Sequence, residues 1–296
     1  MKFLVTGSSG LVGKQVVMDL AKRDFQVYSG YQKAKPEFGI SKQFDITDFD
    51  KVTKVIDSIM PEVIIHLAAM TNVDLCEEEK EKALKINAEA TQTIAKNAAK
   101  HNAFLVYVST DYVFDGKTGM KKEDDHPNPI NFYGRSKYEG EKAVTNSSAK
   151  WSIIRTSTPF GAHPTKKSFP QWVLESLQKG QEIDVVSDQY TSPTYVPNLS
   201  KMLLEVALEQ ITGIMHLAGA TRISRYDVAI QFAEKMNLDK KLINQTTTDK
   251  MIWKAKRPTD SSLDVSKASS ILKEKPLGIE EGLEFFINDI KLQRKG

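Results

Sequence analysis

The sequence has little of what marks exported, membrane-bound or nucleic-acid-binding proteins. Its single cysteine, Cys76, rules out a disulfide within the chain, so we expect a reducing, cytoplasmic location. No apolar run approaches the roughly 20 residues of a membrane span, and a strand pattern follows Lys2 where an exported protein would carry a signal segment. The lysines behind the net charge of +3 are spread along the chain. We therefore expect neither a membrane nor a nucleic-acid partner.

Internal repeats, low-complexity tracts and flexible linkers are also missing. The composition, 40% hydrophobic and 27% charged, is that of an ordinary globular protein. A chain of 296 residues can bury about 75% of its unfolded surface, which is enough for a large core. We therefore expect the second half of the chain to pack directly on the first.

Strands and helices alternate through the first half of the sequence. Residues 62–67 are almost continuously apolar, as expected of a strand covered on both faces, whereas Leu11, Val16 and Leu20 recur at helical spacing. We expect strands over 2–6, 25–29, 40–44, 62–67, 103–109 and 151–156, and helices over 11–23, 48–60, 78–101 and 132–147. This rhythm predicts an α/β fold, a Rossmann-type doubly wound parallel sheet.

The rhythm loosens after residue 157. Helices are expected over 168–179, 196–208, 224–236 and 278–292, and a strand over 213–217. We expect residues 1–157 and 189–219 to form an NAD(P)-binding Rossmann domain, with 189–219 returning to the sheet. Residues 158–188 and 220–296 should form a smaller α/β domain that binds the substrate.

A glycine-rich loop lies between the first expected strand and helix. Gly7 permits a tight turn, Gly10 lets a pyrophosphate approach, and Gly13 lets the helix pack on the strand. The helix N-terminus then offers free N–H groups and partial positive charge to phosphates. The loop therefore predicts a dinucleotide site. Its expected contact residues are Gly7, Ser8, Ser9, Gly10, Leu11, Val12 and Gly13.

The end of the second expected strand distinguishes the two nicotinamide cofactors. An NAD site usually has an acid there to bind the ribose 2′-hydroxyl. Residues 28–35 contain no acid and two cations, Lys33 and Lys35. A 2′-phosphate would be attracted to Lys33, so we predict NADPH as the cofactor, with NADH as the alternative.

Tyr133 and Lys137 form the most telling pair in the chain. Tyr-x-x-x-Lys occurs three times, at Tyr31, Tyr133 and Tyr138, and is a weak signal alone. Only the pair that begins at Tyr133 follows a strand-end hydroxyl, Thr110, by the length of one loop. The spacing of four residues places Tyr133 and Lys137 on one helix face.

This trio has the chemistry of a ketone reductase. A phenol has a pKa near 10, and we expect the Lys137 ammonium to lower the pKa of Tyr133 toward the operating pH. Lys137 can also bind the nicotinamide ribose. Thr110 can donate a hydrogen bond that polarises the substrate carbonyl. We therefore predict Thr110, Tyr133 and Lys137 as the catalytic trio, with Tyr133 as the proton donor.

Longer motifs extend this reading over nearly the whole chain. They are Val5-Thr-Gly-x-x-Gly-x-x-Gly, Asp45-Ile-Thr-Asp, Pro61-Glu-Val-Ile-Ile-His-Leu-Ala-Ala, Ser109-Thr-Asp-Tyr-Val-Phe-Asp-Gly116, Pro129-x-x-x-Tyr-Gly-x-x-Lys137, Ile154-Arg-Thr-Ser157, Asp188-Gln-x-x-Ser-Pro-Thr194 and Arg257-Pro-x-x-Ser-x-Leu-Asp264. With these motifs the chain resembles the extended short-chain dehydrogenases/reductases, and most of all the dTDP-4-dehydrorhamnose reductase family.

The resemblance implies NADPH-dependent reduction of the 4-keto group of dTDP-4-dehydro-6-deoxy-L-mannose, a step of rhamnose biosynthesis. It assigns the same catalytic trio. It also implies cofactor contacts at Asp45, Ile46, Leu67, Ala68, Ala69, Val108 and Ser109, beside Tyr133 and Lys137 themselves. The implied contacts to the nucleotide-sugar are Thr110, Asp111, Tyr112, Gln189 and Arg257.

Two positions depart from the family pattern. Thr158 stands where family members commonly have an aromatic residue that contacts the sugar. Gln15 stands where some members have an acid that binds Mg²⁺, so we expect no metal.

Other functions stay open on the sequence alone. Tyr112 stands where a dehydratase of this fold has a glutamate, which argues against dehydration. A nucleotide-sugar epimerase of the same superfamily would keep its cofactor and consume none. The non-catalytic regulatory subunit of methionine adenosyltransferase resembles the same family, and it too has a basic, proline-containing stretch like 33–38. The sequence also leaves the oligomeric state open, and a homodimer is one possibility.

Overall fold

The computed structural model describes residues 1–293 of the chain. A seven-stranded parallel sheet lies at its centre, in the order β11-β6-β5-β4-β1-β2-β3. Its strands, in chain order, are β1 (Lys2–Thr6), β2 (Gln26–Tyr31), β3 (Ile40–Gln43), β4 (Val63–His66), β5 (Phe104–Thr110), β6 (Lys150–Thr156) and β11 (Gly213–His216). The predicted doubly wound sheet is confirmed, and the strand that follows residue 189 does return to it.

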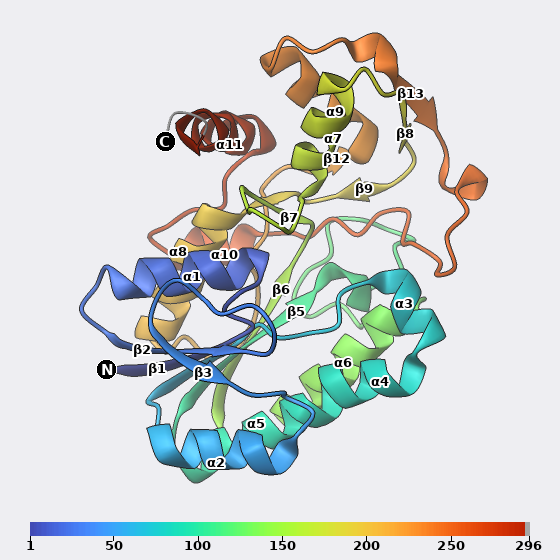
Figure 1. The fold of residues 1–296 in the computed structure, drawn as a ribbon. Coiled ribbons are helices and arrows are strands. Elements are labelled where there is room, and N and C mark those ends of the chain that lie inside the picture. The colour runs from blue at the N-terminus through green and yellow to red at the C-terminus, as the bar shows by residue number, and fades with distance from the viewer. Residues whose placement is uncertain (294–296) are drawn as a thin grey trace.

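Helices cover both faces of this sheet (Figure 1). On one face α1 (Leu11–Ala21) and α8 (Val196–Leu208) bury a cluster around Phe3, Val106 and Leu203. On the other face lie α2 (Phe49–Ile59), α5 (Ala90–Lys100) and α6 (Phe132–Thr145). Because both faces are covered, the central strands are mostly apolar, as the run at 62–67 indicated.

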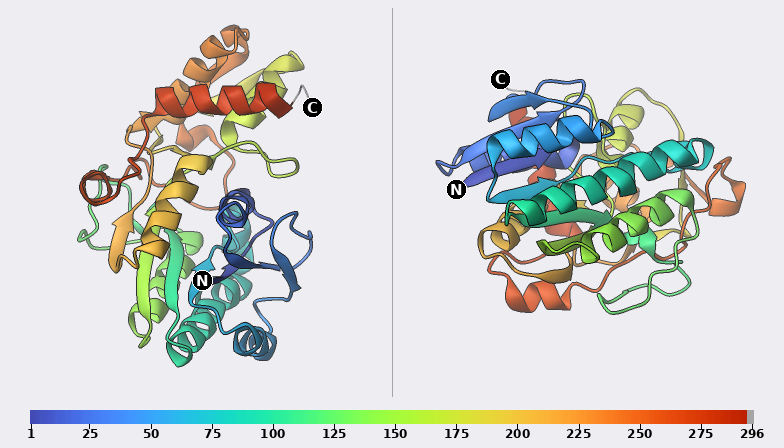
Figure 2. Two further views of the ribbon diagram at one scale, coloured as in Figure 1. Left: turned by 90° about the vertical axis from the view of Figure 1, so that its left-hand side faces the viewer. Right: turned by 90° about the horizontal axis from the view of Figure 1, so that it is seen from below.

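The second half of the chain adds a smaller layer beside the carboxyl ends of the strands (Figure 2). Its main helices are α7 (Phe169–Gln178), α9 (Arg225–Lys235) and α11 (Ile279–Gln293). They pack around a separate cluster that includes Phe160, Phe232 and Phe286. Two four-residue strands, β8 (Ile183–Val186) and β13 (Ile243–Thr246), pair in parallel at its edge.

The predicted helix over 78–101 is wrong in its bounds and its continuity. The segment begins five residues earlier and divides into α3 (Val73–Glu78), α4 (Lys80–Leu84), a π-helical turn (Lys85–Glu89) and α5. Glu79 leaves helical geometry, with φ −112° and ψ 59°. In the π-helical turn, the Asn87 amide hydrogen-bonds the Met70 backbone in both directions. This tertiary contact accompanies the wider turn.

Several short elements of the second half were not predicted. They are β7 (Pro159–Phe160), β9 (Tyr190–Thr191), β10 (Thr194–Tyr195), β12 (Ile223–Ser224) and α10 (Ser266–Ile271), together with β8 and β13. Two-residue strands are too short to show an alternating pattern, and they exist only through pairing with distant segments.

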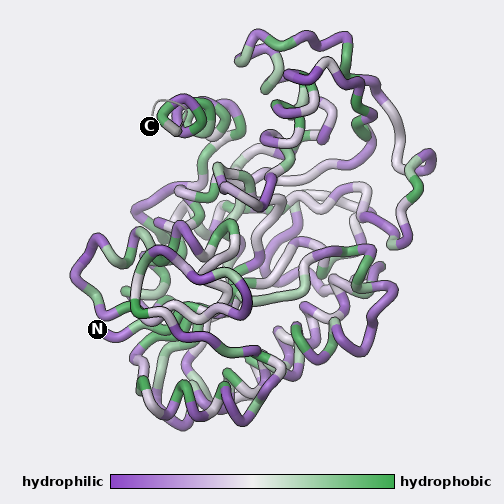
Figure 3. Tube along the Cα trace, in the orientation of Figure 1, coloured by the Kyte–Doolittle hydropathy of each residue, from purple (hydrophilic) through white to green (hydrophobic). Residues whose placement is uncertain are grey.

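Hydrophobic and hydrophilic stretches alternate along the outer helices, as in amphipathic surface helices (Figure 3). Over residues 1–293, no helix combines the length and apolarity that a bilayer crossing needs.

Candidate active site

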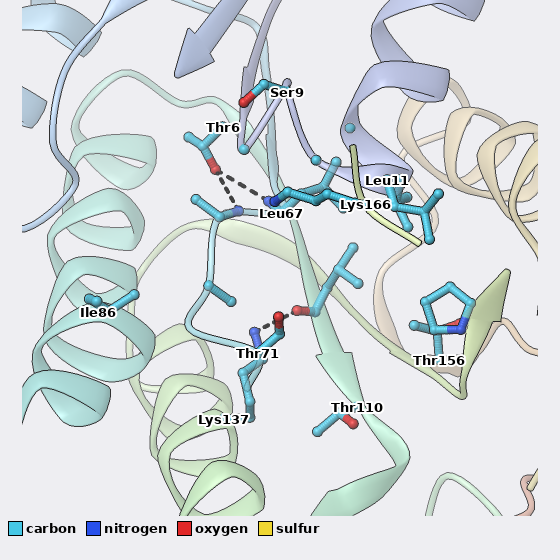
Figure 4. Close-up of a pocket in the computed structure, with 18 of the residues that line it drawn as sticks. Thr6, Ser9, Leu11, Leu67, Thr71, Ile86, Thr110, Lys137, Thr156 and Lys166 are labelled. Atoms are coloured by element: carbon cyan, nitrogen blue, oxygen red, sulfur yellow. Dashed lines mark hydrogen bonds between the residues drawn. The ribbon is translucent and has the colours of Figure 1, made fainter. Parts of the chain in front are cut away.

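A cavity of about 740 Å³ lies where the carboxyl ends of the central strands face the second half of the chain. This is the edge at which open α/β sheets bind ligands. In Figure 4, Thr6, Ser9 and Lys166 lie at one end of the cavity, and Lys137 and Thr110 lie at the other. The cavity therefore has a glycine-loop end and a catalytic-trio end.

The glycine loop needs its glycines for close backbone packing. Gly7 has φ +69°, and a Cβ there would lie 2.8 Å from the Ala68 nitrogen. A Cβ on Gly13 would lie 2.1 Å from the Gly7 carbonyl oxygen, so only glycine fits at this point. Gly10 is less crowded, at 3.1 Å from the same oxygen. The turn thus stays tight, and α1 begins directly behind it at Leu11.

Most of the predicted cofactor contacts line the cavity. They are Gly7, Ser9, Gly10, Leu11, Val12, Gly13, Lys33, Asp45, Ile46, Leu67, Ala68, Ala69, Val108, Ser109, Tyr133 and Lys137. Ser8 does not line it, contrary to our prediction, because its side chain is fully buried and donates to the Gly30 carbonyl at 2.8 Å. Ser8 therefore fixes the loop to β2.

Cations from two parts of the chain border the glycine-loop end. Lys33 follows β2, as predicted, and no acid lies at the end of that strand. Thr165, Lys166 and Lys167 come from the loop after β7 and were not predicted. Lys167 pairs with Glu175, whereas Lys166 lines the cavity at the end where Thr6 and Ser9 lie (Figure 4). No pattern in the sequence distinguishes Lys166 from other surface lysines.

Helix α6, which carries Tyr133 and Lys137, is fixed at its start. The Asn131 side chain caps it by accepting from the Gly134 N–H at 2.8 Å, and such caps stabilise a helix by about 1 kcal/mol. One turn later, Ser136 accepts from the Asn87 amide at 2.9 Å and donates to the Tyr133 carbonyl at 2.8 Å. These bonds hold Tyr133 and Lys137 on the face of α6 that lines the cavity.

Lys137 is almost completely buried, at 3% exposure. Its ammonium donates to the Val108 carbonyl at 2.7 Å and lies 4.2 Å from the centre of the Tyr107 ring. Burial lowers the pKa of Lys137 to about 7, although the Glu141 carboxylate opposes the shift. Lys137 can therefore change its protonation state near neutral pH.

The expectation that Lys137 lowers the pKa of Tyr133 is wrong for this structure. Burial raises the pKa of Tyr133, and the Asp111 carboxylate raises it further, while a hydrogen bond with Thr110 lowers it. The Lys137 ammonium is directed at Val108 and not at the phenol. Tyr133 therefore keeps its proton at neutral pH, which suits a proton donor.

Thr110 is part of a buried hydroxyl cluster around Asp111. Its Oγ1 donates to Asp111 Oδ1 at 2.9 Å, and Ser157 and Ser261 donate to the other carboxylate oxygen at 2.8 and 2.6 Å. Burial raises the pKa of Asp111 despite these three donors. The Thr110 hydroxyl is thus directed at Asp111, and its oxygen accepts from the Tyr112 backbone N–H at 3.2 Å.

The predicted substrate contacts are only partly in the cavity. Thr110, Asp111 and Tyr112 line it, but Gln189 and Arg257 do not. Gln189 is 1% exposed and donates to the Tyr112 hydroxyl at 3.3 Å, so it supports the wall from behind. Arg257 is held by both oxygens of Asp74, at 3.0 and 2.8 Å, outside the cavity lining.

Arg225, which sequence reasoning missed, does line the cavity. It is the first residue of α9 and lies beside Thr158, the position of the family's aromatic residue. Thr158 has φ +40°, which is unusual for a β-branched residue and marks a strained turn at the cavity wall.

Comparison with known proteins agrees with this geometry. The model of the family described as RmlD substrate binding domain matches residues 1–292. The chain belongs to this family. It is 34% identical over 295 residues to the dTDP-4-dehydrorhamnose reductase of Aggregatibacter actinomycetemcomitans, covering 96% of this chain and 97% of the relative. The predicted family is therefore confirmed.

Two further relatives represent different roles. Methionine adenosyltransferase 2 subunit beta of Bos taurus is 30% identical over 300 residues, which is 97% of this chain and 89% of the relative. The structure of dTDP-4-dehydrorhamnose reductase from Bacillus anthracis in complex with NADP has a TM-score of 0.88 at 32% identity, covering 97% of this chain and 99% of the other.

Proposed function

We propose that this protein reduces the 4-keto group of a nucleotide-linked 6-deoxysugar with NADPH, as a dTDP-4-dehydrorhamnose reductase. The observation that carries the proposal is the meeting of Thr110, Tyr133 and Lys137 in the same cavity as the glycine loop. Membership of the family and near full-length similarity to a named reductase support it.

The residues at the glycine-loop end fit NADPH. The turn at Gly7, Gly10 and Gly13 leaves the N-terminus of α1 open to a pyrophosphate. Lys33 would bind the 2′-phosphate, and residues 32–36, which directly follow β2, contain no acid that would favour a 2′-hydroxyl. A relative was solved with NADP. We therefore expect tighter binding of NADPH than of NADH in a fluorescence titration, and equal affinities would contradict this choice.

The side chains at the other end supply the proton. When bound, NADPH supplies the hydride for the substrate carbonyl. Tyr133 holds its proton, since its pKa is raised, and donates it to the carbonyl oxygen as that oxygen gains charge. Thr110 hydrogen-bonds the phenol and so orients it, and Asp111 fixes Thr110 in turn. Lys137, held by the Val108 carbonyl one helix turn from Tyr133, is placed to bind the nicotinamide ribose.

The direct test is an assay of cofactor consumption. With dTDP-4-dehydro-6-deoxy-L-mannose as substrate, we expect one NADPH oxidised for each sugar reduced, followed as loss of absorbance at the nicotinamide band. A panel of other nucleotide-linked ketosugars would define the base and the sugar. No turnover with any ketosugar would overturn the proposal.

A regulatory role is the second candidate, because relatives named methionine adenosyltransferase 2 subunit beta are 30–32% identical to this chain. A regulator would bind a methionine adenosyltransferase and alter its kinetics without reducing a ketosugar. Co-purification with that enzyme, combined with the reductase assay, separates the two roles. The sequence also left an epimerase open, and net oxidation of NADPH would exclude one.

The remaining expectations belong to the same proposal. We propose a cytoplasmic location, which agrees with the single buried Cys76. We also propose the predicted division into an NAD(P)-binding domain over 1–157 and 189–219 and a substrate-binding domain over 158–188 and 220–296. A homodimer stays a prediction, which analytical ultracentrifugation of the purified protein would check.

A further inference from the structure

We propose that Arg225 binds the diphosphate group of the sugar-nucleotide substrate. The inference rests on the proposed function, because it assumes a nucleoside diphosphate-sugar in the cavity. It replaces Arg257, which the sequence had suggested for the nucleotide-sugar and which lies outside the cavity lining, paired with Asp74.

The structure fixes Arg225 in two ways. Its backbone N–H donates to the Gln189 carbonyl at 3.2 Å, directly next to the antiparallel pairing of β12 with β9. Its side-chain Nε donates to Gln189 Oε1 at 2.8 Å. Gln189 is itself buried, and it donates to the Tyr112 hydroxyl and the Pro258 carbonyl. Arg225 is therefore held in place before any ligand arrives.

The bond to Gln189 uses the Nε nitrogen of the Arg225 guanidinium and leaves the two Nη nitrogens available to a ligand. Within residues 1–293, neither Nη nitrogen of Arg225 has a hydrogen-bond or ion-pair partner. The guanidinium packs over the Phe169 ring, 5.3 Å from its centre, at the cavity wall. A guanidinium in this state offers a planar pair of donors that matches the geometry of a phosphate.

The position of Arg225 relative to the trio suits this ligand. The Tyr133 and Tyr112 rings lie 6.0 Å apart, and Gln189 connects Tyr112 to Arg225. A sugar whose keto group meets Tyr133 would thus pass Tyr112 and bring its diphosphate toward Arg225. Burial raises the pKa of Asp111 and of Tyr112, and the Arg225 charge opposes this rise in both, so the charge acts within this end of the cavity.

The other cations near the cavity lie at its opposite end or are already bound to other residues. Lys33 and Lys166 border the glycine-loop end, and Lys137 is bound to Val108. Arg222, three residues before Arg225, pairs with Asp260 and packs on Tyr190. Arg222 does not line the cavity and is therefore a matched control for a change of arginine in the same segment.

The test is calorimetric binding of thymidine diphosphate and of thymidine to the full chain saturated with NADP⁺, for the natural protein and for Arg225→Met, Arg225→Lys and Arg222→Met. Arg225→Met should raise the dissociation constant of thymidine diphosphate about 50-fold. This corresponds to about 2.3 kcal/mol, since each tenfold change is worth about 1.4 kcal/mol. Arg225→Lys should lose less, since it keeps the charge without the fork. The affinity for thymidine, the NADPH affinity and the Arg222→Met variant should be unchanged.

Two failures are distinguishable. If Arg225→Met binds thymidine diphosphate as tightly as the natural protein does, the role of Arg225 is overturned and the proposed reductase stands. The same holds if the variant loses affinity for thymidine and for thymidine diphosphate to the same extent. If neither thymidine diphosphate nor uridine diphosphate binds the natural protein, the proposed function fails together with this inference.

Discussion

The two ends of the cavity are built in different ways. The glycine-loop end is centred on the backbone of one stretch, residues 7–13, whose shape depends on Gly7 and Gly13, where a Cβ has no room. The other end is formed by side chains from distant segments. Asp111 is held there by Ser157 and Ser261, and Arg225 is held by Gln189.

This difference separates binding from chemistry. A backbone cradle can hold a diphosphate in any chain that makes the same turn, so it defines a cofactor and no particular reaction. We propose that the side-chain end defines which carbonyl is reduced, because a phenol, a hydroxyl and two cations line the cavity there. The comparison predicts that changes at the two ends will affect different measurements.

The largest effect is expected at the side-chain end, from Tyr133→Phe. Loss of the proton donor should lower kcat about 10³-fold, within the range of general acid catalysis. The NADPH dissociation constant should stay near that of the natural protein, because the glycine loop is untouched. Native turnover of the ketosugar by Tyr133→Phe would show that another group donates the proton.

The matching change at the backbone end is Gly13→Ala. Its Cβ would lie 2.1 Å from the Gly7 carbonyl oxygen, so the turn must open, at a cost of about 3 kcal/mol in the free energy of unfolding. Gly10→Ala is the control, because its Cβ would lie 3.1 Å from the same oxygen. Urea denaturation should separate the two variants, and equal stability would contradict the packing argument.

Lys137 should make the stability depend on pH. Its pKa is about 7 in the folded protein and about 10.4 when unfolded, so between these values the unfolded chain binds more protons and stability rises with pH. The unfolding free energy of the natural protein, minus that of Lys137→Met, should increase by up to about 1.4 kcal/mol per pH unit in this window. Urea denaturation at pH 7, 8 and 9 measures it, and a constant difference would mean that Lys137 stays charged.

A smaller effect is expected from Ser261→Ala, which removes one of three hydroxyl donors to Asp111. The loss should be about 1–2 kcal/mol in unfolding free energy, as for a hydrogen bond to a buried charge. Ser270→Ala is the control, since Ser270 is exposed and bonds only within its own helix turn, to the Lys267 carbonyl. If both variants lose the same stability in thermal denaturation, Ser261 has no special role at Asp111.

The same contrast explains how much could be predicted from the sequence. The sheet, the glycine loop and the pair Tyr133 and Lys137 follow from patterns within one or two neighbouring elements. Lys33 was found in the same way, from the stretch after β2. Such local patterns can be recognised in a sequence without knowledge of the tertiary structure.

The features that were missed depend on contacts between distant segments. Nothing near Arg225 in the sequence says that Gln189, 36 residues away, holds it in the cavity. Arg257 lies in a motif of the family, yet Asp74 binds it from 183 residues away. The direction of the Lys137 ammonium likewise depends on the Val108 carbonyl on another element. Local patterns carry no information about such partners.

The most direct test of the account follows the hydrogen itself. NADPH carrying deuterium in both positions at C4 would be incubated with the protein and dTDP-4-dehydro-6-deoxy-L-mannose, and the sugar analysed by mass spectrometry and NMR. We predict one deuterium at C4 of the product sugar for each NADPH oxidised. A sugar without deuterium, with the label retained on the cofactor, would contradict the proposal that the cavity is the site of ketone reduction.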